Sequence, residues 1–529
     1  MDRETVYNAY IEAGSIAAAA RLLQVPRSTF RHYVRKGWLQ ESISDTGPKV
    51  DGSVEAQQIE KRKLPKTIQR YILTSAQNNT RLNDEVWNNI LALSDYYEAE
   101  IIVGTYTYNT AFYGHSAAKF GSERSDQESL WYDERLVPYI NGGDNKNIEL
   151  APGLIWCGRA NILPTAERPL SGFETYTGSA SGIFPHAKIA LQSIPTGKFD
   201  KVKMNYTTGT VTQRNYIQKK AGLKAEHHHT YGALVVEIDS EGTWFVRQLN
   251  ADSNGLICDL EVQVINQVVT TGNRVLGINW GDIHVAKRDK ISYHLAWGID
   301  GIMDTLKPYY QFMNDLVDFE TRNHHSLDHY SLFIRHKHTH DSVEEEMREV
   351  ARFLAWARRG YCETVVVDSN HDNALAKWVK TADYRTDPPN AIFFLECQLQ
   401  KYKALRDEVP FNMVAWVLNT FDETPKNIRY LQADESFVIA GSIECGMHGH
   451  LGPNGSKGTP RGLSRIGRKA NTGHTHTAEI HDGLYVAGVT GRLDHGYNVG
   501  PSSWSQSHII TYPNGKRSII TLSNGKWRL

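Results

Sequence analysis

Five short polar segments in the second half of the chain are built from histidine, aspartate and asparagine. In chain order they contain Asp282 and His284, then Asp315 with Asp318, then Asn370-His371-Asp372, then His448 and His450, and finally His474 and His476. Carboxylate, imidazole and amide ligands together suit borderline divalent ions such as Mn²⁺, Fe²⁺ or Zn²⁺. Two such ions can stabilise both oxygens of a displacement at phosphorus. These residue types therefore point to metal-assisted hydrolysis of a phosphate ester.

Strand-like runs of apolar and β-branched residues precede these segments. Residues 273–280 (NRVLGINW) precede the first, residues 363–368 (ETVVVD) the third and residues 436–445 (SFVIAGSIEC) the fourth. Active sites of α/β sheets lie in the loops at the C-terminal ends of strands. One such segment could arise by chance, but five in this order predict a single shared site.

Taken together, the segments resemble the signature of the calcineurin-like metallophosphoesterase superfamily. That signature reads D-x-H, GD, GNHD or GNHE, a single His, and GHxH, and the similarity spans residues 275–490. The resemblance implies a β-sandwich flanked by helices. Two positions depart from it, because Asn314 and Ser369 stand where the family has glycine. Neither glycine is a metal ligand, but the loops must turn without them, so backbone strain is expected first at Ser369.

The resemblance also implies a two-metal site, with Mn²⁺ expected ahead of Fe²⁺ or Zn²⁺. One ion would be held by Asp282, His284 and His476, and the other by Asn370, His448 and His474. Asp315 would bridge the two ions, and Asp318 is the alternative bridge.

Residues beside the metal ligands would act on the substrate. By resemblance, His371 would face the scissile phosphate and Asp372 would orient this histidine. His448 is the expected ligand of the fourth segment, which leaves His450 nearer the substrate. His324 and His325 closely follow the second segment, and they are further candidates for the substrate side.

The first 40 residues predict a helix-turn-helix. Ser15 can cap a helix that runs to Leu23, and Pro26 suits the start of a second helix. The segment holds six Lys and Arg against three Asp and Glu, which favours DNA contact over a protein-binding role. The expected DNA contacts are Arg27, Ser28, Thr29, Arg31 and Arg35.

The remaining chain divides into three predicted regions. Residues 41–66 are polar and rich in turn formers, as in a flexible linker. Residues 67–270 begin with a β-α-β pattern and predict a separate α/β domain without an assigned role. Residues 271–529 form the predicted phosphoesterase domain.

A basic, glycine-rich loop covers residues 451–470 between the fourth and fifth segments. It contains five Lys and Arg and no acidic residue. Such a loop can grip nucleic-acid phosphates, although an ordinary surface loop is the alternative. The expected contacts are Lys457, Arg461, Arg465, Arg468 and Lys469.

Composition limits the class of protein. The 529 residues are 40% hydrophobic with a net charge of −1, and they contain no apolar run long enough to span a membrane. The N-terminus lacks the pattern of a signal peptide, so we expect a cytoplasmic protein. The five cysteines are scattered and are expected to be reduced. The oligomeric state stays open, a homo-oligomer included.

These features favour a DNA nuclease that uses two metal ions, similar in chemistry to the SbcD-type nucleases of the superfamily. The layout also resembles phosphoesterases encoded by tailed bacteriophages, which act in the host cytoplasm. Two alternatives stay open: a phosphomonoesterase such as a protein phosphatase, and a DNA-binding regulator with an inert phosphoesterase domain. Against the first, the residues after Asp315 lack the Asp-Arg-Gly with which Ser/Thr protein phosphatases hold phosphate.

Overall fold

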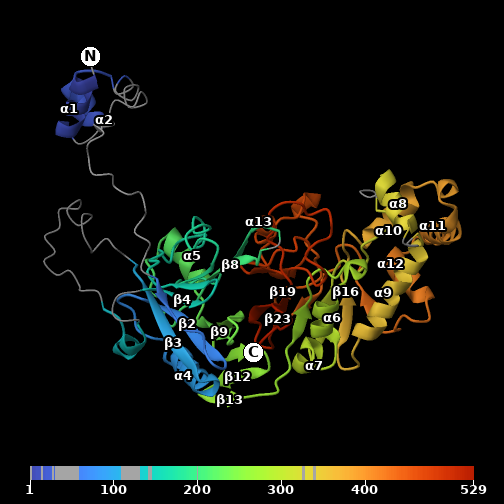
Figure 1. The fold of residues 1–529 in the computed structure, drawn as a ribbon, viewed down its shortest axis with the longest axis horizontal. Coiled ribbons are helices and arrows are strands. Elements are labelled where there is room, and N and C mark those ends of the chain that lie inside the picture. The colour runs from blue at the N-terminus through green and yellow to red at the C-terminus, as the bar shows by residue number, and fades with distance from the viewer. Residues whose placement is uncertain are drawn as a thin grey trace. The chain divides into compact units, whose positions relative to one another are not determined.

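The computed structural model describes most of the chain after residue 58 and parts of the segment before it. The described residues are 3–13, 16–26, 29, 59–108, 131–140, 146–198, 200–323, 328–337 and 341–529. They form two units, Met1–Gln58 and Ile59–Leu529 (Figure 1). Within these ranges, no helix is both long enough and apolar enough to cross a bilayer.

The N-terminal unit contains helices α1 (Arg3–Ala13) and α2 (Ile16–Leu22). Helix α2 matches the first helix of the predicted helix-turn-helix, and a turn at Gln24, with φ of 52°, follows it. Of the five DNA contacts expected in this N-terminal unit, Thr29 has a helical backbone conformation. The others, Arg27, Ser28, Arg31 and Arg35, lie outside the described residues.

The predicted β-α-β pattern is present at the start of the second unit. Strands β2 (Gln69–Gln77) and β3 (Ala99–Tyr106) are parallel, and helix α4 (Asp84–Tyr97) connects them. The Asn83 side chain caps α4 by accepting a hydrogen bond from the Val86 N–H. Strands β9 (Gly232–Ile238) and β10 (Trp244–Asn250) complete a sheet of order β10-β9-β2-β3.

A larger sheet joins residues on both sides of position 270. In spatial order its described strands are β1 (Glu60–Lys61), β4 (Asn147–Ala151), β5 (Leu154–Cys157), β6 (Ser181–Phe184), β8 (Lys203–Thr207), β7 (Leu191–Ile194), β21 (Glu479–His481), β22 (Leu484–Val486), β20 (Lys469–Thr472), β19 (Ile443–Glu444) and β18 (Val438–Ile439). The antiparallel pair β7–β21 connects the two regions. The region before residue 270 and the region after it therefore share one sheet, although the sequence predicts two domains there.

A third sheet carries the first three motif loops. Its order is β17 (Ile428–Tyr430), β16 (Glu363–Val366), β15 (Tyr310–Met313), β14 (Gly277–Asn279), β23 (Ser507–Thr511) and β24 (Arg517–Thr521). The strands β14 to β17 are parallel, so their C-terminal ends lie at the same edge. A small sheet of β11 (Ile257–Asp259), β12 (Val262–Ile265) and β13 (Val268–Thr270) precedes it in the chain.

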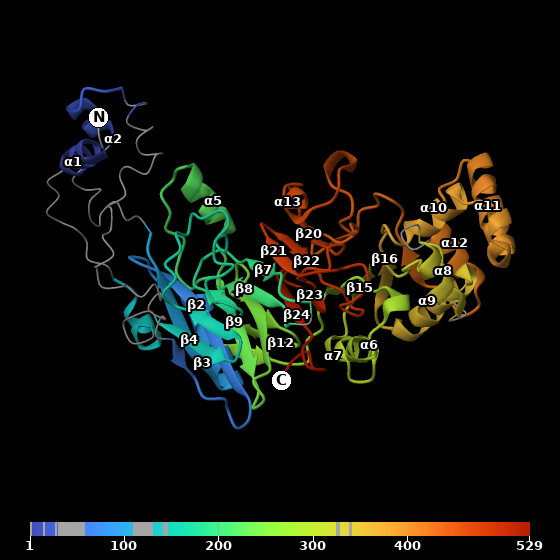
Figure 2. The same ribbon diagram turned by 45° about the horizontal axis from the view of Figure 1, so that its top comes forward.

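Most described helices of the second unit gather around this third sheet (Figures 1 and 2). They are α6 (Lys290–Trp297), α7 (Ile302–Leu306), α8 (His329–Lys337), α9 (Val343–Ala357), α10 (Asn373–Thr381), α11 (Ala391–Arg406) and α12 (Met413–Thr420), whereas α5 (Lys220–His228) and α13 (Pro460–Leu463) lie elsewhere. Buried apolar residues of α9, such as Val350 and Leu354, pack in one core with Met313 and Val366 of the sheet. The described part is thus a mixed α/β structure, and its five cysteines are buried and unpaired, as the sequence predicts.

A buried ionic network links the four-stranded sheet to the C-terminus. The Arg247 guanidinium donates to both carboxylate oxygens of Asp259, at 2.7 Å each, and to Glu237 Oε2 at 2.6 Å. Arg70 donates to the other oxygen of Glu237, and the backbone N–H of Leu529 donates to Glu237 Oε2. A buried carboxylate is stable only while its partners remain.

We therefore predict that Arg247→Ala lowers the free energy of unfolding by about 3–5 kcal/mol, because it leaves the buried Asp259 carboxylate without a cation and leaves Glu237 with Arg70 alone. Urea denaturation and Tm would measure this loss. Arg352→Ala is the matched control, since Arg352 pairs with Glu345 and Glu349 on the exposed side of α9 and should change stability by less than about 1 kcal/mol. Equal losses in the two variants would contradict the prediction.

Candidate metal centre

The five predicted segments meet at one place, where the third sheet and the large sheet adjoin. Backbone hydrogen bonds tie the loops together: His284 N donates to Asp315 O at 2.7 Å, and Gly473 N donates to His448 O at 2.8 Å. The loop after β14 is also bonded to the segment after β22, because Thr490 N donates to Asp282 O at 2.8 Å. Side chains from five loops are thereby brought into one buried cluster.

The first group of ligand atoms comes from Asp282, His284 and His476, all of which are buried. His476 Nε2 lies 3.1 Å from Asp282 Oδ2 and 3.1 Å from His284 Nε2. Atoms bound at about 2.1 Å to one ion lie roughly 3.0–3.4 Å apart in octahedral or tetrahedral geometry. These three atoms therefore have the spacing of ligands around a single ion.

The second group comes from Asn370, His448 and His474. Asn370 Oδ1 lies 2.9 Å from His448 Nε2 and 3.1 Å from His474 Nδ1. The same spacing argument applies to these atoms. His450, in contrast, packs its ring against that of His448, with the two ring centroids 5.4 Å apart. The structure thus places His448 within 2.9 Å of the Asn370 oxygen and leaves His450 beside it.

Asp315 lies between the two groups. Its Oδ2 atom is 3.2 Å from His448 Nε2 and 3.9 Å from His284 Nε2. Asp318 occupies a different place, because its Oδ1 lies 3.1 Å from His284 Nδ1, on the side of the ring away from the other ligands. Asp315 therefore has the position of a bridging carboxylate, and Asp318 has that of a carboxylate that orients a histidine ligand.

The site residues themselves adopt left-handed backbone conformations. The φ angles are 49° at His284, 45° at Asp315, 75° at His474 and 56° at His476. Such conformations in residues other than glycine cost about 1–3 kcal/mol each and often occur at functional sites. Ser369 does not have a positive φ, so the sequence-based expectation of strain there is wrong. The left-handed conformations occur instead at four of the candidate ligands.

Ser369 has a bonding role that glycine could not perform. Its hydroxyl donates to Asp372 Oδ2 at 2.8 Å and accepts a hydrogen bond from Asp315 N at 3.2 Å. Asp372 also accepts from the Val317 N–H at 2.8 Å. These contacts hold the second and third loops together. They correct the prediction that Asp372 orients His371, because the oxygens of Asp372 are engaged by Ser369 and Val317.

His371 is oriented by the second loop instead. Its Nδ1 lies 3.3 Å from the backbone oxygen of Asp318, and its own N–H donates to Asp315 Oδ1 at 3.1 Å. Its ring meets that of His284 edge to face, with centroids 4.8 Å apart. His371 is thus held next to both ligand groups while remaining partly exposed.

Electrostatic coupling within the cluster is strong. Burial alone would raise the pKa of Asp315, but His448 and His371 hold it well below its ordinary value. Burial would lower the pKa of His448, yet Asp315 and Asp282 raise it to about 9. Burial, followed by the proximity of Asp315, raises the pKa of Asp372 to about 7. Opposite charges therefore stabilise one another across the two ligand groups.

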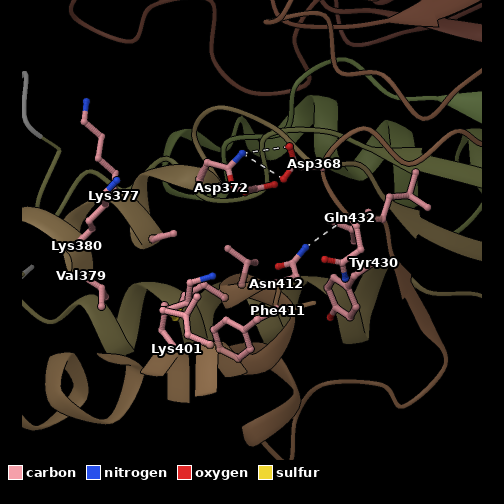
Figure 3. Close-up of a pocket in the computed structure, with 18 of the residues that line it drawn as sticks. Asp368, Asp372, Lys377, Val379, Lys380, Lys401, Phe411, Asn412, Tyr430 and Gln432 are labelled. Atoms are coloured by element: carbon pink, nitrogen blue, oxygen red, sulfur yellow. Dashed lines mark hydrogen bonds between the residues drawn. The ribbon is translucent and has the colours of Figure 1, made fainter. Parts of the chain in front are cut away.

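Asp372 also lines a cavity of about 720 Å³, together with Asp368 of the same turn (Figure 3). Lys380, Phe411 and Tyr430 contribute to its walls. The metal cluster and this cavity therefore share one turn of the chain.

No protein-family model matches the chain. The chain is 40% identical to protein A1 of Escherichia phage T5 over 477 residues, which cover 87% of this chain and 82% of the phage protein. The chain belongs to the A1 family. This relationship supports the phage origin that the sequence layout suggests.

This A1-family site contains one histidine that the sequence analysis did not select. His495 is buried, and its ring centroid lies 4.9 Å from that of His284 and 5.5 Å from that of His476. The three histidines form a group that could hold a metal ion. The signal in the sequence is weak, because Asp494-His495-Gly496 reads as an ordinary turn.

The donor set in this A1-family protein fits a cation. Asp282 Oδ1 is fully buried and has no hydrogen-bond partner among the described residues, although such an atom normally has one. Asp282, His284, Asp315 and His476 together form a buried group that could bind a metal ion. His324 and His325 lie outside the described residues, so their predicted place near the substrate stays a prediction.

The positions of Asp315 and Asp318 lead to a prediction about metal pairing. Asp315→Asn should abolish the spin-coupled Mn²⁺ pair signal in electron paramagnetic resonance, because the bridging position is altered. Asp318→Asn should keep that signal and weaken Mn²⁺ binding by about 10–100-fold in calorimetry, as for other residues that orient a ligand. The exposed Asp422→Asn is the control and should match the unmodified protein. A coupled signal that survives in Asp315→Asn and is lost in Asp318→Asn would assign the bridge to Asp318.

Proposed function

We propose that this A1-family protein is a metal-dependent phosphodiesterase that hydrolyses DNA and that its catalytic region has the calcineurin-like metallophosphoesterase fold. The position of Asp315 carries the proposal. One carboxylate oxygen lies between two groups of ligand atoms, each with the spacing expected around one ion. A site that held a single structural ion would need only one of these groups.

The proposed ligands of the first ion are Asp282, His284 and His476, and those of the second are Asn370, His448 and His474, with Asp315 shared. Two divalent ions bound there would supply an activated water and neutralise charge on the phosphate. The resident ions proposed are Mn²⁺, with Fe²⁺ or Zn²⁺ as substitutes.

His371 is the proposed catalytic acid. The backbone oxygen of Asp318 can only accept a hydrogen bond, so its proximity to Nδ1 favours the tautomer with the proton on Nδ1. The neutral ring then offers Nε2 to the substrate. When the ring is protonated, Nε2 can donate a proton to the leaving oxygen. Asp315 Oδ1 fixes the backbone of His371 by accepting its N–H, so the bridge and the acid are positioned together.

Basic residues near the centre favour a polyanionic substrate. Lys457, Arg461 and Arg465 are exposed on the segment between the ligands His448 and His474. A phosphomonoester needs few such contacts, whereas DNA binding depends on many contacts to phosphates. The predicted helix-turn-helix would add further DNA contacts.

In the test, the protein is incubated with Mn²⁺ and one substrate at a time. The substrates are plasmid DNA, linear DNA, single-stranded DNA, p-nitrophenyl phosphate and its bis-ester. We expect cleavage of DNA and of the bis-ester. Asp282→Asn should lose both turnover and the rise in Tm on adding Mn²⁺. His371→Gln should lower kcat by about 10²–10⁴-fold and keep the rise in Tm, because His371 is not a proposed ligand.

The exposed His294→Gln on α6 is the matched control and should keep full activity. Turnover of the monoester with intact DNA would assign the site to a phosphomonoesterase. Tight binding of duplex DNA without any turnover would favour a regulator with an inert catalytic domain. Either result would contradict the proposed function.

A further inference from the structure

A cavity of about 850 Å³ with a strongly basic lining lies apart from the metal ligands. Its walls come from segments far apart in the sequence: residues 188–189, 214, 227–230, 250, 441–442, 464, 467–469, 480, 482–483, 485 and 515–517. The lysines and arginines among them are Lys188, Arg214, Arg468, Lys469, Lys516 and Arg517. Among the described residues that line the cavity, Asp482 is the sole carboxylate. The lining therefore has a large excess of positive charge.

Two of these cations already have carboxylate partners. Lys188 forms an ion pair with Asp482, and Arg468 NH1 lies 3.0 Å from Glu444 Oε2. The pair with Asp482 uses the one acid that lines the cavity. The other four cations must therefore find their counter-charge elsewhere.

None of these four cations forms a close ion pair with a carboxylate among the described residues, although the more distant Asp252 acts on Lys516. Arg517 is buried, donates to the carbonyl oxygens of Ala470 and Gly483, and stacks over the Tyr485 ring at 4.0 Å. Arg214 lies over the ring of Tyr231 at 5.5 Å. These contacts orient the guanidinium groups but do not neutralise them.

The remaining two, Lys469 and Lys516, are close enough to affect each other. Burial, followed by the proximity of Lys469, lowers the pKa of Lys516. Burial and the proximity of Arg517 lower the pKa of Lys469. Lys516 is half-buried and Lys469 is exposed. Like charges that repel at such a site are stabilised when an anion binds among them.

Two strands connect this cavity to the metal centre. Lys469 begins β20, and the ligand His474 follows the end of that strand. Gly483 precedes β22, and Val489 beyond β22 pairs with Asp282. At about 3.3 Å per residue, the five steps from Lys469 to His474 span roughly 16 Å. An anion in the cavity would therefore lie several phosphates away from a scissile bond at the metals.

We propose that this cavity binds the phosphodiester backbone of the DNA substrate at a distance from the bond that is cut. This proposal rests on the proposed function, because it takes the molecule bound in the cavity to be the substrate of the metal centre. The same two strands connect the cavity to the proposed metal ligands. The cavity is larger than a single phosphate needs, and its cations come from several walls, which suits a chain of phosphates. Arg461 and Arg465 extend the basic surface along the same loop.

The test measures binding without metal, so that it does not depend on catalysis. A fluorescein-labelled single-stranded oligonucleotide of about 20 nucleotides is titrated in EDTA at several KCl concentrations, and fluorescence anisotropy gives Kd. The double variant Lys469→Gln, Lys516→Gln should weaken binding about tenfold. It should also lower the magnitude of the slope of log K against log salt by about 1.4, because each of two lost phosphate contacts on a single strand contributes about 0.7.

Two controls separate a loss of charge from a loss of structure. Lys403→Gln with Lys426→Gln removes two exposed lysines outside the cavity and should leave Kd and slope unchanged. Lys469→Arg with Lys516→Arg keeps the charge and should restore both quantities. Equal Tm values for all variants are expected, because neither Lys469 nor Lys516 forms a close ion pair with a carboxylate among the described residues.

Several outcomes would overturn the proposal. One is an unchanged slope in the glutamine double variant, and another is an equal loss of affinity in the exposed-lysine control. A third is competition by polyglutamate as strong as competition by unlabelled oligonucleotide, because that result would indicate an acidic peptide ligand. Turnover of the bis-ester is measured in parallel. A failure of the proposed function would abolish that turnover in the unmodified protein, whereas a failure of the cavity proposal would leave it intact.

Discussion

The site depends on the contacts that one buried carboxylate, that of Asp315, makes with the residues around it. Its Oδ2 atom lies 3.2 Å from His448 Nε2 and 3.9 Å from His284 Nε2, and these two candidate ligands belong to different groups. Its second oxygen accepts the N–H of His371, and its own N–H donates to Ser369. One side chain thus sets the separation of the two ligand groups and the place of the candidate acid. A carboxylate buried at this depth requires opposite charge around it, which the histidines supply in part and cations would complete.

The fold supports this arrangement by joining two sheets. The first three loops follow parallel strands of one sheet, and the last two follow strands of the large sheet. Four of the site residues adopt left-handed backbone conformations to turn their side chains inward. Gly473 shows how little room is left, because a Cβ atom there would collide with the Asp282 carboxylate. The tightly packed core around the third sheet stabilises the strain stored in these loops.

Charge is distributed in a complementary way over the two ends of β20. At its C-terminal end, buried carboxylates and imidazoles form a group suited to cations. At its start lies Lys469, one of four cations that form no close ion pair with a carboxylate among the described residues and that line a cavity suited to anions. One short strand therefore lies between a candidate metal centre and a candidate phosphate-binding cavity. Such an arrangement is expected of a protein that holds a long polyanion at one point and cuts it at another.

The sequence by itself determined the types and order of the candidate ligands and the local elements before them. The 3.6-residue and two-residue periodicities are local properties, which is why β2, α4, β3 and the strand before Asn370 lie where the patterns place them. The tertiary structure alone decided which atoms face one another. Asp318, and not Asp372, lies beside His371. His495 joins the site from a segment whose sequence gives only a weak signal. The left-handed backbone conformations occur at four candidate ligands and not at Ser369. The tertiary structure also assembled the basic cavity from segments more than 300 residues apart, since Lys188 and Arg517 both line it. These features depend on the long-range pairing of two sheets, and no local pattern encodes that register.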